Sequence, residues 1–80
     1  MKKTHLEEHL FVICINNKYY PASLEFGKIY RIIPDSEAEK HGYFRVIDES
    51  GEDYAYASDR FFPIELPQKL EKVFLSASRA

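Results

Sequence analysis

The residues best suited to metal chemistry lie near the start of the chain, in the segment His5-Leu6-Glu7-Glu8-His9. This order matches the His-x-x-Glu-His motif of inverted zinc peptidases, in which both histidines bind zinc and the glutamate acts as base. A chain of 80 residues is far too short for a peptidase, and a five-residue match near a terminus arises easily by chance. We therefore predict no metal site and no cofactor, and we expect residues 1–9 to form a flexible N-terminus.

Cys14 is the second candidate for chemistry, and it is the only cysteine in the chain. One cysteine excludes an internal disulfide and any paired-cysteine metal motif. It lies in the apolar run 10–15, where cysteine is usually a small core residue. Neither Cys14 nor His41 has a partner at a spacing that would identify a nucleophile and its base. The sequence therefore favours a non-enzymatic protein, and a single reduced cysteine without a signal-peptide pattern favours a cytoplasmic location.

Four carboxylates surround one turn of the chain, at Asp48, Glu49, Glu52 and Asp53. Their spacing differs from that of an EF-hand loop, which needs oxygen ligands at fixed alternate positions. The prediction is a solvated hairpin tip. The alternative is a docking patch for a basic partner.

Six tyrosines form the most informative set, because each hydroxyl needs water or a hydrogen-bond partner and six cannot all be fully buried in so small a protein. One interpretation places Tyr30 and Tyr56 in the core and the other four at its rim. The other interpretation makes the rim a binding surface, since aromatic residues and arginine carry binding energy at interfaces. The residues of this candidate surface are Tyr19, Tyr20, Tyr43, Arg45, Tyr54 and Arg60.

Short strands must position these residues. Aromatic and β-branched runs on either side of the turn at 48–53 predict a β-hairpin, with Phe44 and Val46 on one face. Further strands are expected at 10–15, 28–33 and 62–66. A short helical turn is expected near 36–41, with Gly42 as its stop, and a single turn at 58–60. The sequence thus predicts a mainly β domain of about five short strands.

The end of the chain predicts a short amphipathic helix over residues 67–77. Pro67 suits the first helical position, and the apolar residues that follow recur at helical spacing. The expected apolar stripe consists of Leu70, Val73, Phe74 and Ala77.

Two segments give this chain a resemblance to the SH3-like small β-barrels. Residues 24–33, Leu-Glu-Phe-Gly-Lys-Ile-Tyr-Arg-Ile-Ile, look like the SH3 segment in which an apolar residue and a glycine lead into the second strand. Residues 56–61, Tyr-Ala-Ser-Asp-Arg-Phe, look like the one-turn helix before the last SH3 strand. The resemblance implies an SH3-like barrel over residues 10–66, closest to the compact SH3-like domains found widely in bacterial proteins.

The departures from the SH3 pattern bear on function. The chain has no Trp, and Ala57 and Arg60 stand where the ligand-binding Pro and Tyr would be. We therefore do not expect recognition of proline-rich peptides, which needs an aromatic-lined groove.

Composition and charge direct the choice of partner. A net charge of -2 and a pI near 5.9 disfavour a nucleic-acid binder, which usually carries a basic stripe. No apolar run is long enough to cross a membrane. The leading hypothesis is a small interaction module that binds a protein or peptide through the Tyr/Arg surface, and the alternative is a nucleic-acid-binding small barrel whose tyrosines stack on bases.

Overall fold

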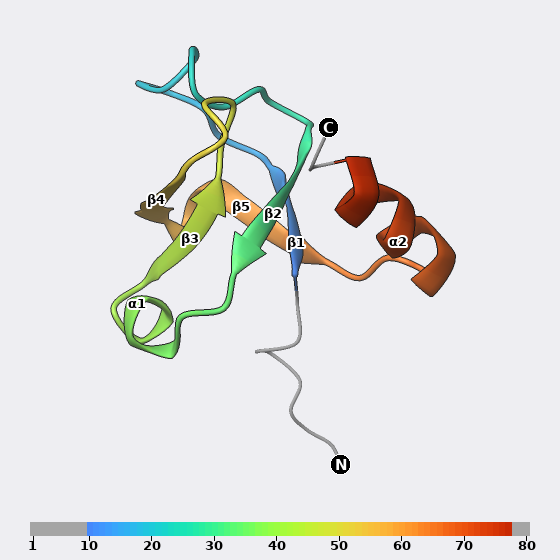
Figure 1. The fold of residues 1–80 in the computed structure, drawn as a ribbon. Helices are drawn as coiled ribbons and strands as arrows, with labels where there is room; N and C mark the ends of the chain where they lie inside the picture. Colours follow the sequence, from blue (N-terminus) through green and yellow to red (C-terminus); the bar gives the residue numbers. More distant parts are fainter. Residues whose placement is uncertain (1–9, 78–80) are drawn as a thin grey trace.

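The computed structural model describes residues 10–77, which contain five antiparallel strands, two short α-helices and one 3-10 turn (Figure 1). The predicted mainly β fold with short helices is confirmed. The elements are β1 (Phe11–Cys14), β2 (Ile29–Ile33), α1 (Ser36–Lys40), β3 (Tyr43–Ile47), β4 (Asp53–Ala57), η2 (Ser58–Arg60), β5 (Phe61–Ile64) and α2 (Gln68–Ala77). The predictions for residues 1–9, including the histidine motif, concern residues outside the described part of the chain.

The five strands form one sheet in the order β4-β3-β2-β1-β5. Each neighbouring pair is antiparallel, and the sheet is not closed, since no ladder joins β4 to β5 within residues 10–77. This strand order is consistent with an SH3-like fold.

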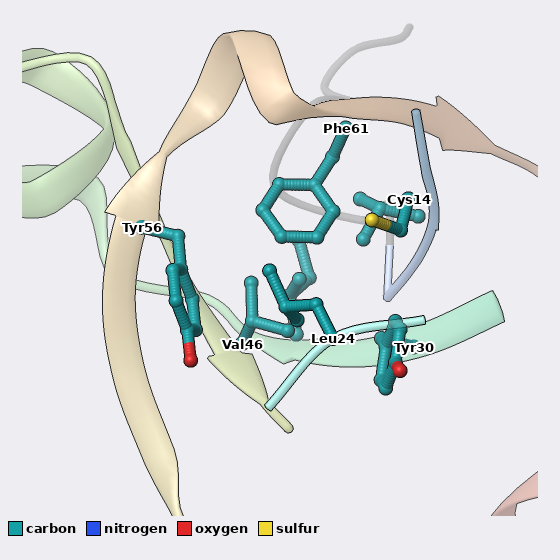
Figure 2. Close-up of a cluster of buried hydrophobic side chains, with 8 residues drawn as sticks. Cys14, Leu24, Tyr30, Val46, Tyr56 and Phe61 are labelled. Atoms are coloured by element: carbon teal, nitrogen blue, oxygen red, sulfur yellow. The ribbon is translucent and has the colours of Figure 1, made fainter. Parts of the chain in front are cut away.

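The core lies on the inner face of the curved sheet, where alternate residues of the strands converge (Figure 2). Phe44 and Val46 face this core, as the hairpin pattern predicted, and Tyr30 and Tyr56 are buried in it. The buried cluster consists of Val12, Cys14, Leu24, Tyr30, Ile32, Val46, Tyr56 and Phe61. Burial of Cys14 confirms its interpretation as a core residue.

Strand β1 is buried on both of its faces. Val12 and Cys14 point into the core, while Phe11 is buried on the opposite face. There the ring of Phe11 meets the ring of Phe74 from α2 edge to face, with centroids 5.8 Å apart. The helix therefore covers the outer face at this strand, which explains why β1 reads as a continuous apolar run.

Helix α2 packs through a narrower side than its sequence pattern indicated. Leu70 and Val73, two residues of the predicted apolar stripe, are 41% and 57% exposed. The contact is made by Phe74, because Phe11 is the large side chain that β1 offers on this face. A groove of about 550 Å³ remains beside this contact. The side chain of Ala77 lies outside the described residues.

Local signals set the ends of α1 as predicted. The Asp35 side chain accepts a hydrogen bond from the Ala38 N–H at 3.1 Å, which caps the helix. Gly42 follows with a φ of +84°, a left-handed conformation that favours glycine. The chain can therefore turn directly into β3.

Candidate binding surface

Arg60 connects the 3-10 turn η2 to the long segment between β1 and β2. Its Nη1 donates to the carbonyl oxygens of Asn16 and Lys18, at 3.1 and 2.7 Å. The guanidinium carbon also lies 4.7 Å from the centre of the Tyr20 ring, in cation-π geometry. One side chain from the end of the domain therefore fixes a segment more than 40 residues earlier in the chain.

Tyr20 is held between this arginine and the core. Its ring meets the ring of Tyr56 edge to face, with centroids 5.1 Å apart. Tyr56 in turn packs against Phe61 in the core. Tyr20 thus has a fixed inner edge, while much of its surface stays exposed.

Tyr19 projects into solvent from the same segment. It is 78% exposed, and its backbone has a φ of +76°, which is unusual for a bulky residue. Hydrogen bonds on either side, from the Lys18 N–H to Asn16 Oδ1 and from the Tyr20 N–H to the Asn17 carbonyl, maintain this turn. The ammonium of Lys18 lies 5.4 Å from the centre of the Tyr19 ring. We call Tyr19, Tyr20 and Arg60 the aromatic corner.

The other three residues of the predicted surface are divided between the two faces of the β3–β4 hairpin. Tyr43 is exposed and lies opposite Ala57, on the outer face of β3. Tyr54 lies opposite the buried Val46, on the inner side of β4, and is 53% exposed. The structure therefore brings Tyr19, Tyr20 and Arg60 together and places Tyr54 on the other strand face from Tyr43.

Arg45 lies on the outer face of the hairpin and is already paired. Its Nη2 lies 3.2 Å from a carboxylate oxygen of Asp35, and its Nε lies 3.4 Å from one of Asp53. These two pairs connect α1, β3 and β4. The arrangement gives Arg45 a role within the fold.

The solvated tip predicted for the turn between β3 and β4 holds for the exposed carboxylates of Glu49, Glu52 and Asp53 and is wrong for Asp48, which is only 5% exposed. Asp48 Oδ2 accepts a hydrogen bond from the Tyr56 hydroxyl at 2.6 Å. Its Oδ1 accepts from the Ser50 hydroxyl at 2.6 Å and from the Ser50 N–H at 2.9 Å. Asp two residues before Ser at a turn is a pattern that favours such side-chain bonds, and it is the sequence signal for this role.

Glu49 forms a second anchor beside the first. Its Oε2 accepts from the Tyr30 hydroxyl at 2.5 Å and from the Lys28 ammonium at 2.6 Å. Its backbone N–H donates to the Ser23 carbonyl, in the segment that carries the aromatic corner. The turn therefore holds both buried tyrosines and the segment that precedes β2.

These contacts shift the ionisation of all four groups. Burial disfavours the charged form of Asp48, but hydrogen bonds from Ser50 and Tyr56 outweigh it and hold the pKa of this carboxyl below its usual value. The hydrogen bonds from Lys28 and Tyr30 lower the pKa of Glu49. Burial and the bond to Asp48 raise the pKa of Tyr56 to about 12, and burial with the bond to Glu49 raises the pKa of Tyr30.

The two candidates for catalysis lie on different elements, Cys14 in β1 and His41 at the end of α1. Cys14 is fully buried. His41 is exposed after α1, with its Nε2 3.4 Å from a Glu37 carboxylate oxygen. Within residues 10–77, no group of three or more His, Cys, Asp or Glu side chains could hold a metal ion. Over the same residues, no helix is long and apolar enough to cross a membrane.

Comparison with known proteins does not place the chain in a family. No family model, curated protein or solved structure matches it.

Proposed function

We propose that this protein is a non-enzymatic, SH3-like interaction module that binds a protein or peptide through the aromatic corner. Support for the SH3-like fold comes from the strand order, with β5 beside β1, and from the 3-10 turn directly before the last strand. The single cysteine, which is free and buried in the core, is compatible with a cytoplasmic location.

The observation that carries the proposal is the conformation of Tyr19. A bulky aromatic residue with left-handed backbone angles costs about 1–2 kcal/mol, and Tyr19 does not recover this cost by burial, since it is 78% exposed. Strain of this kind is concentrated at functional sites. The hydrogen-bonded turn also fixes the backbone of Tyr19 before binding, so less conformational entropy is lost on binding, which raises affinity. These features are what a contact residue requires.

Arg60 and Tyr20 supply the support that a binding site needs. The guanidinium is fixed by two carbonyl oxygens, and the Tyr20 ring is fixed by Tyr56. Tyr and Arg are the residue types enriched at the energetic centres of protein interfaces. Rigid support of the residues in contact with the ligand favours specific binding.

One observation favours nucleic acid as the alternative partner. Lysine and arginine cations lie against the exposed rings, Lys18 at Tyr19 and Arg60 at Tyr20. Single-stranded nucleic acids bind to surfaces that combine basic groups with stacking platforms. The net charge of -2 still favours a protein partner.

The test is affinity capture from the soluble extract of the source organism, with and without nuclease, using the immobilised protein and two variants. Tyr19→Gly removes the ring while keeping a residue that accepts a φ of +76°, so the variant stays folded. Phe62→Ala removes a 61% exposed ring from β5, away from the aromatic corner, and is the control. We expect a protein that is captured by the wild type and by Phe62→Ala, in the presence of nuclease, and is lost with Tyr19→Gly.

Each other outcome has a defined meaning. Bound material that disappears with nuclease, and whose binding weakens steeply as salt is raised, supports the nucleic-acid alternative. Equal capture by Tyr19→Gly and the wild type contradicts the aromatic corner as the binding site.

A further inference from the structure

The free edge of β4 carries unpaired backbone groups. At one end of the hairpin the Ser58 N–H donates to the Gly42 carbonyl, and at the other the Asp48 N–H donates to the Glu52 carbonyl. Because hydrogen-bonding direction alternates along an antiparallel strand, Tyr54 and Tyr56 also bond toward β3. The backbone N–H and C=O groups of Asp53 and Ala55 and the N–H of Ala57 therefore point away from the sheet, whereas the Ala57 carbonyl is taken up by η2, of which Ala57 is the N-cap. Within residues 10–77, none of these outward-pointing groups has a hydrogen-bond partner.

The opposite edge of the sheet, β5, is closed to an added strand. The Ile15 N–H donates to the Arg60 carbonyl, so Phe62 and Ile64 bond toward β1 while Phe61 and Pro63 point outward. Proline has no N–H, and the Phe61 N–H already donates to the Ser58 carbonyl. A proline on the outward side is a usual protection of an edge strand, and β4 has no proline.

The side chains of β4 leave room for a neighbouring strand. Ala55 and Ala57 have small side chains, and Ala55 is exposed, so neither blocks an added strand on the outer side of the edge. On the inner side Tyr54 is half-exposed and can cover an apolar side chain of the added strand. Strand β4 also lies at the outer margin of the sheet, where α1 and α2 do not cover it (Figure 1).

The charges at the two ends of β4 select the occupant. Glu52 lies just before its start and Asp59 just beyond its end, both exposed, while Asp53 at its start is paired with Arg45. The nearby cations are engaged, since Arg45 pairs with Asp35 and Asp53, and Arg60 binds carbonyl oxygens in another segment. A strand with basic residues near both ends would therefore complement the edge.

The same charges disfavour a second copy of this chain. Two β4 strands paired about Ala55 would run antiparallel, because the two copies are related by a two-fold axis. The acidic start of one strand would then lie beside the acidic end of the other, with Glu52 facing Ser58 and Asp59. Like charges placed across paired strands are destabilising.

We propose that the free edge of β4 binds an extended, basic peptide segment of a protein partner as an added strand of the sheet. Main-chain hydrogen bonds to Asp53, Ala55 and Ala57 supply the affinity, and the acidic ends set the register. The edge is a different surface from the aromatic corner, so this proposal stands independently of the proposed function.

The test uses a synthetic probe, the acetylated and amidated hexapeptide Lys-Thr-Val-Thr-Val-Lys, titrated into the isotope-labelled protein and followed by nuclear magnetic resonance. We expect the amides of Asp53, Ala55 and Ala57 to shift and to gain protection from hydrogen exchange, because they become hydrogen-bonded. Two control peptides are used: one with Glu in place of both Lys, and one N-methylated at alternate residues so that it cannot pair. Neither control should bind.

Variants of the edge make the test specific. Ala55→Pro removes one outward N–H without touching the bonds to β3, and it should weaken the probe by about tenfold. Ala55→Thr keeps the N–H and is the matched control, with an affinity within about twofold of the wild type. If Ala55→Pro does not fold, the double variant Glu52→Gln/Asp59→Asn serves instead, and it should weaken the Lys probe and abolish the preference over the Glu peptide.

Three results would overturn the proposal. The first is the absence of any amide shift at about 1 mM probe, and the second is unchanged binding to Ala55→Pro. The third is a sedimentation measurement showing a dimer that Ala55→Pro dissociates, because the occupant of the edge would then be a second copy.

Discussion

Replacement of Asp48 by Asn tests the main structural argument most directly. The carboxylate is 5% exposed and accepts three hydrogen bonds, from the Tyr56 hydroxyl, the Ser50 hydroxyl and the Ser50 N–H. Asparagine has nearly the same size but provides one acceptor oxygen and a donor NH₂ group. Either the Tyr56 hydroxyl or the two Ser50 donors would therefore face the NH₂ group in place of an acceptor oxygen.

The magnitude follows from the kind of bond that is lost. Hydrogen bonds to a charged group contribute about 1.5–3 kcal/mol each and neutral ones about 0.5–1.5 kcal/mol. The loss over three bonds is offset in part because a buried carboxylate no longer has to be desolvated. We expect Asp48→Asn to lower the free energy of unfolding by about 2 kcal/mol at pH 7. For a domain of this size that corresponds to a decrease in Tm of roughly 8–16 °C.

The assay is urea and thermal unfolding of the wild type, Asp48→Asn and the control Glu52→Gln between pH 7 and pH 3. Glu52 is exposed in the same turn, so its variant should stay within about 0.5 kcal/mol of the wild type. The folded-state pKa of Asp48 lies below its unfolded value, so its contribution is present above an unfolded pKa near 4 and is lost as the pH falls through the folded pKa. The stabilities of the wild type and Asp48→Asn should therefore converge in acid. A difference smaller than about 0.5 kcal/mol at pH 7, or one that does not shrink in acid, would refute the reasoning.

Three further predictions concern the core, the helix and alkaline pH. Val46→Asp should unfold the domain, because it places an unpaired charge at a fully buried position. Circular dichroism and the dispersion of the amide proton signals will detect the unfolding. A folded variant would mean that the strand register is wrong. Phe74→Ala should lower the free energy of unfolding in urea by about 1–2 kcal/mol through loss of the contact with Phe11, whereas the exposed Val73→Ala should change it by less than about 0.5 kcal/mol; equal effects would mean that α2 does not dock through Phe74. The pKa of Tyr56 is raised in the folded state, so its contribution to stability is complete below pH 10 and is lost as the pH rises through about 12. Tyr56→Phe should therefore make the free energy of unfolding depend less on pH in this interval. An unchanged dependence would contradict the role given to Tyr56.

The hairpin shows what local sequence can predict. The alternation through Phe44 and Val46, the polar turn, and Gly42 at a left-handed position are all set by near neighbours. Each signal acts over a few residues, so each can be recognised without knowledge of the tertiary structure. The strands and the short helices follow from signals of this kind, and the burial of Tyr30 and Tyr56 follows from their place on the inner face.

The acidic turn shows what local sequence could not predict. A run containing Asp48, Glu49, Glu52 and Asp53 resembles a solvated tip, because charge alone indicates exposure. The hydrogen bond from Tyr30 to Glu49 spans 19 residues, and the one from Tyr56 to Asp48 requires the turn to fold back over its own strand. Arg45 is a similar case, since its partner Asp35 precedes α1. These pairings depend on the complete topology.

The same turn connects the two proposed surfaces. Glu49 binds the segment of the aromatic corner through its N–H at the Ser23 carbonyl, and the turn that Asp48 stabilises leads directly into β4. Because the pKa values of both carboxyls are lowered in the folded state, acidification through those values removes support from the corner and from the start of the β4 edge together. Binding at either surface should therefore weaken over the same acidic interval, even though the two surfaces share no contact residue.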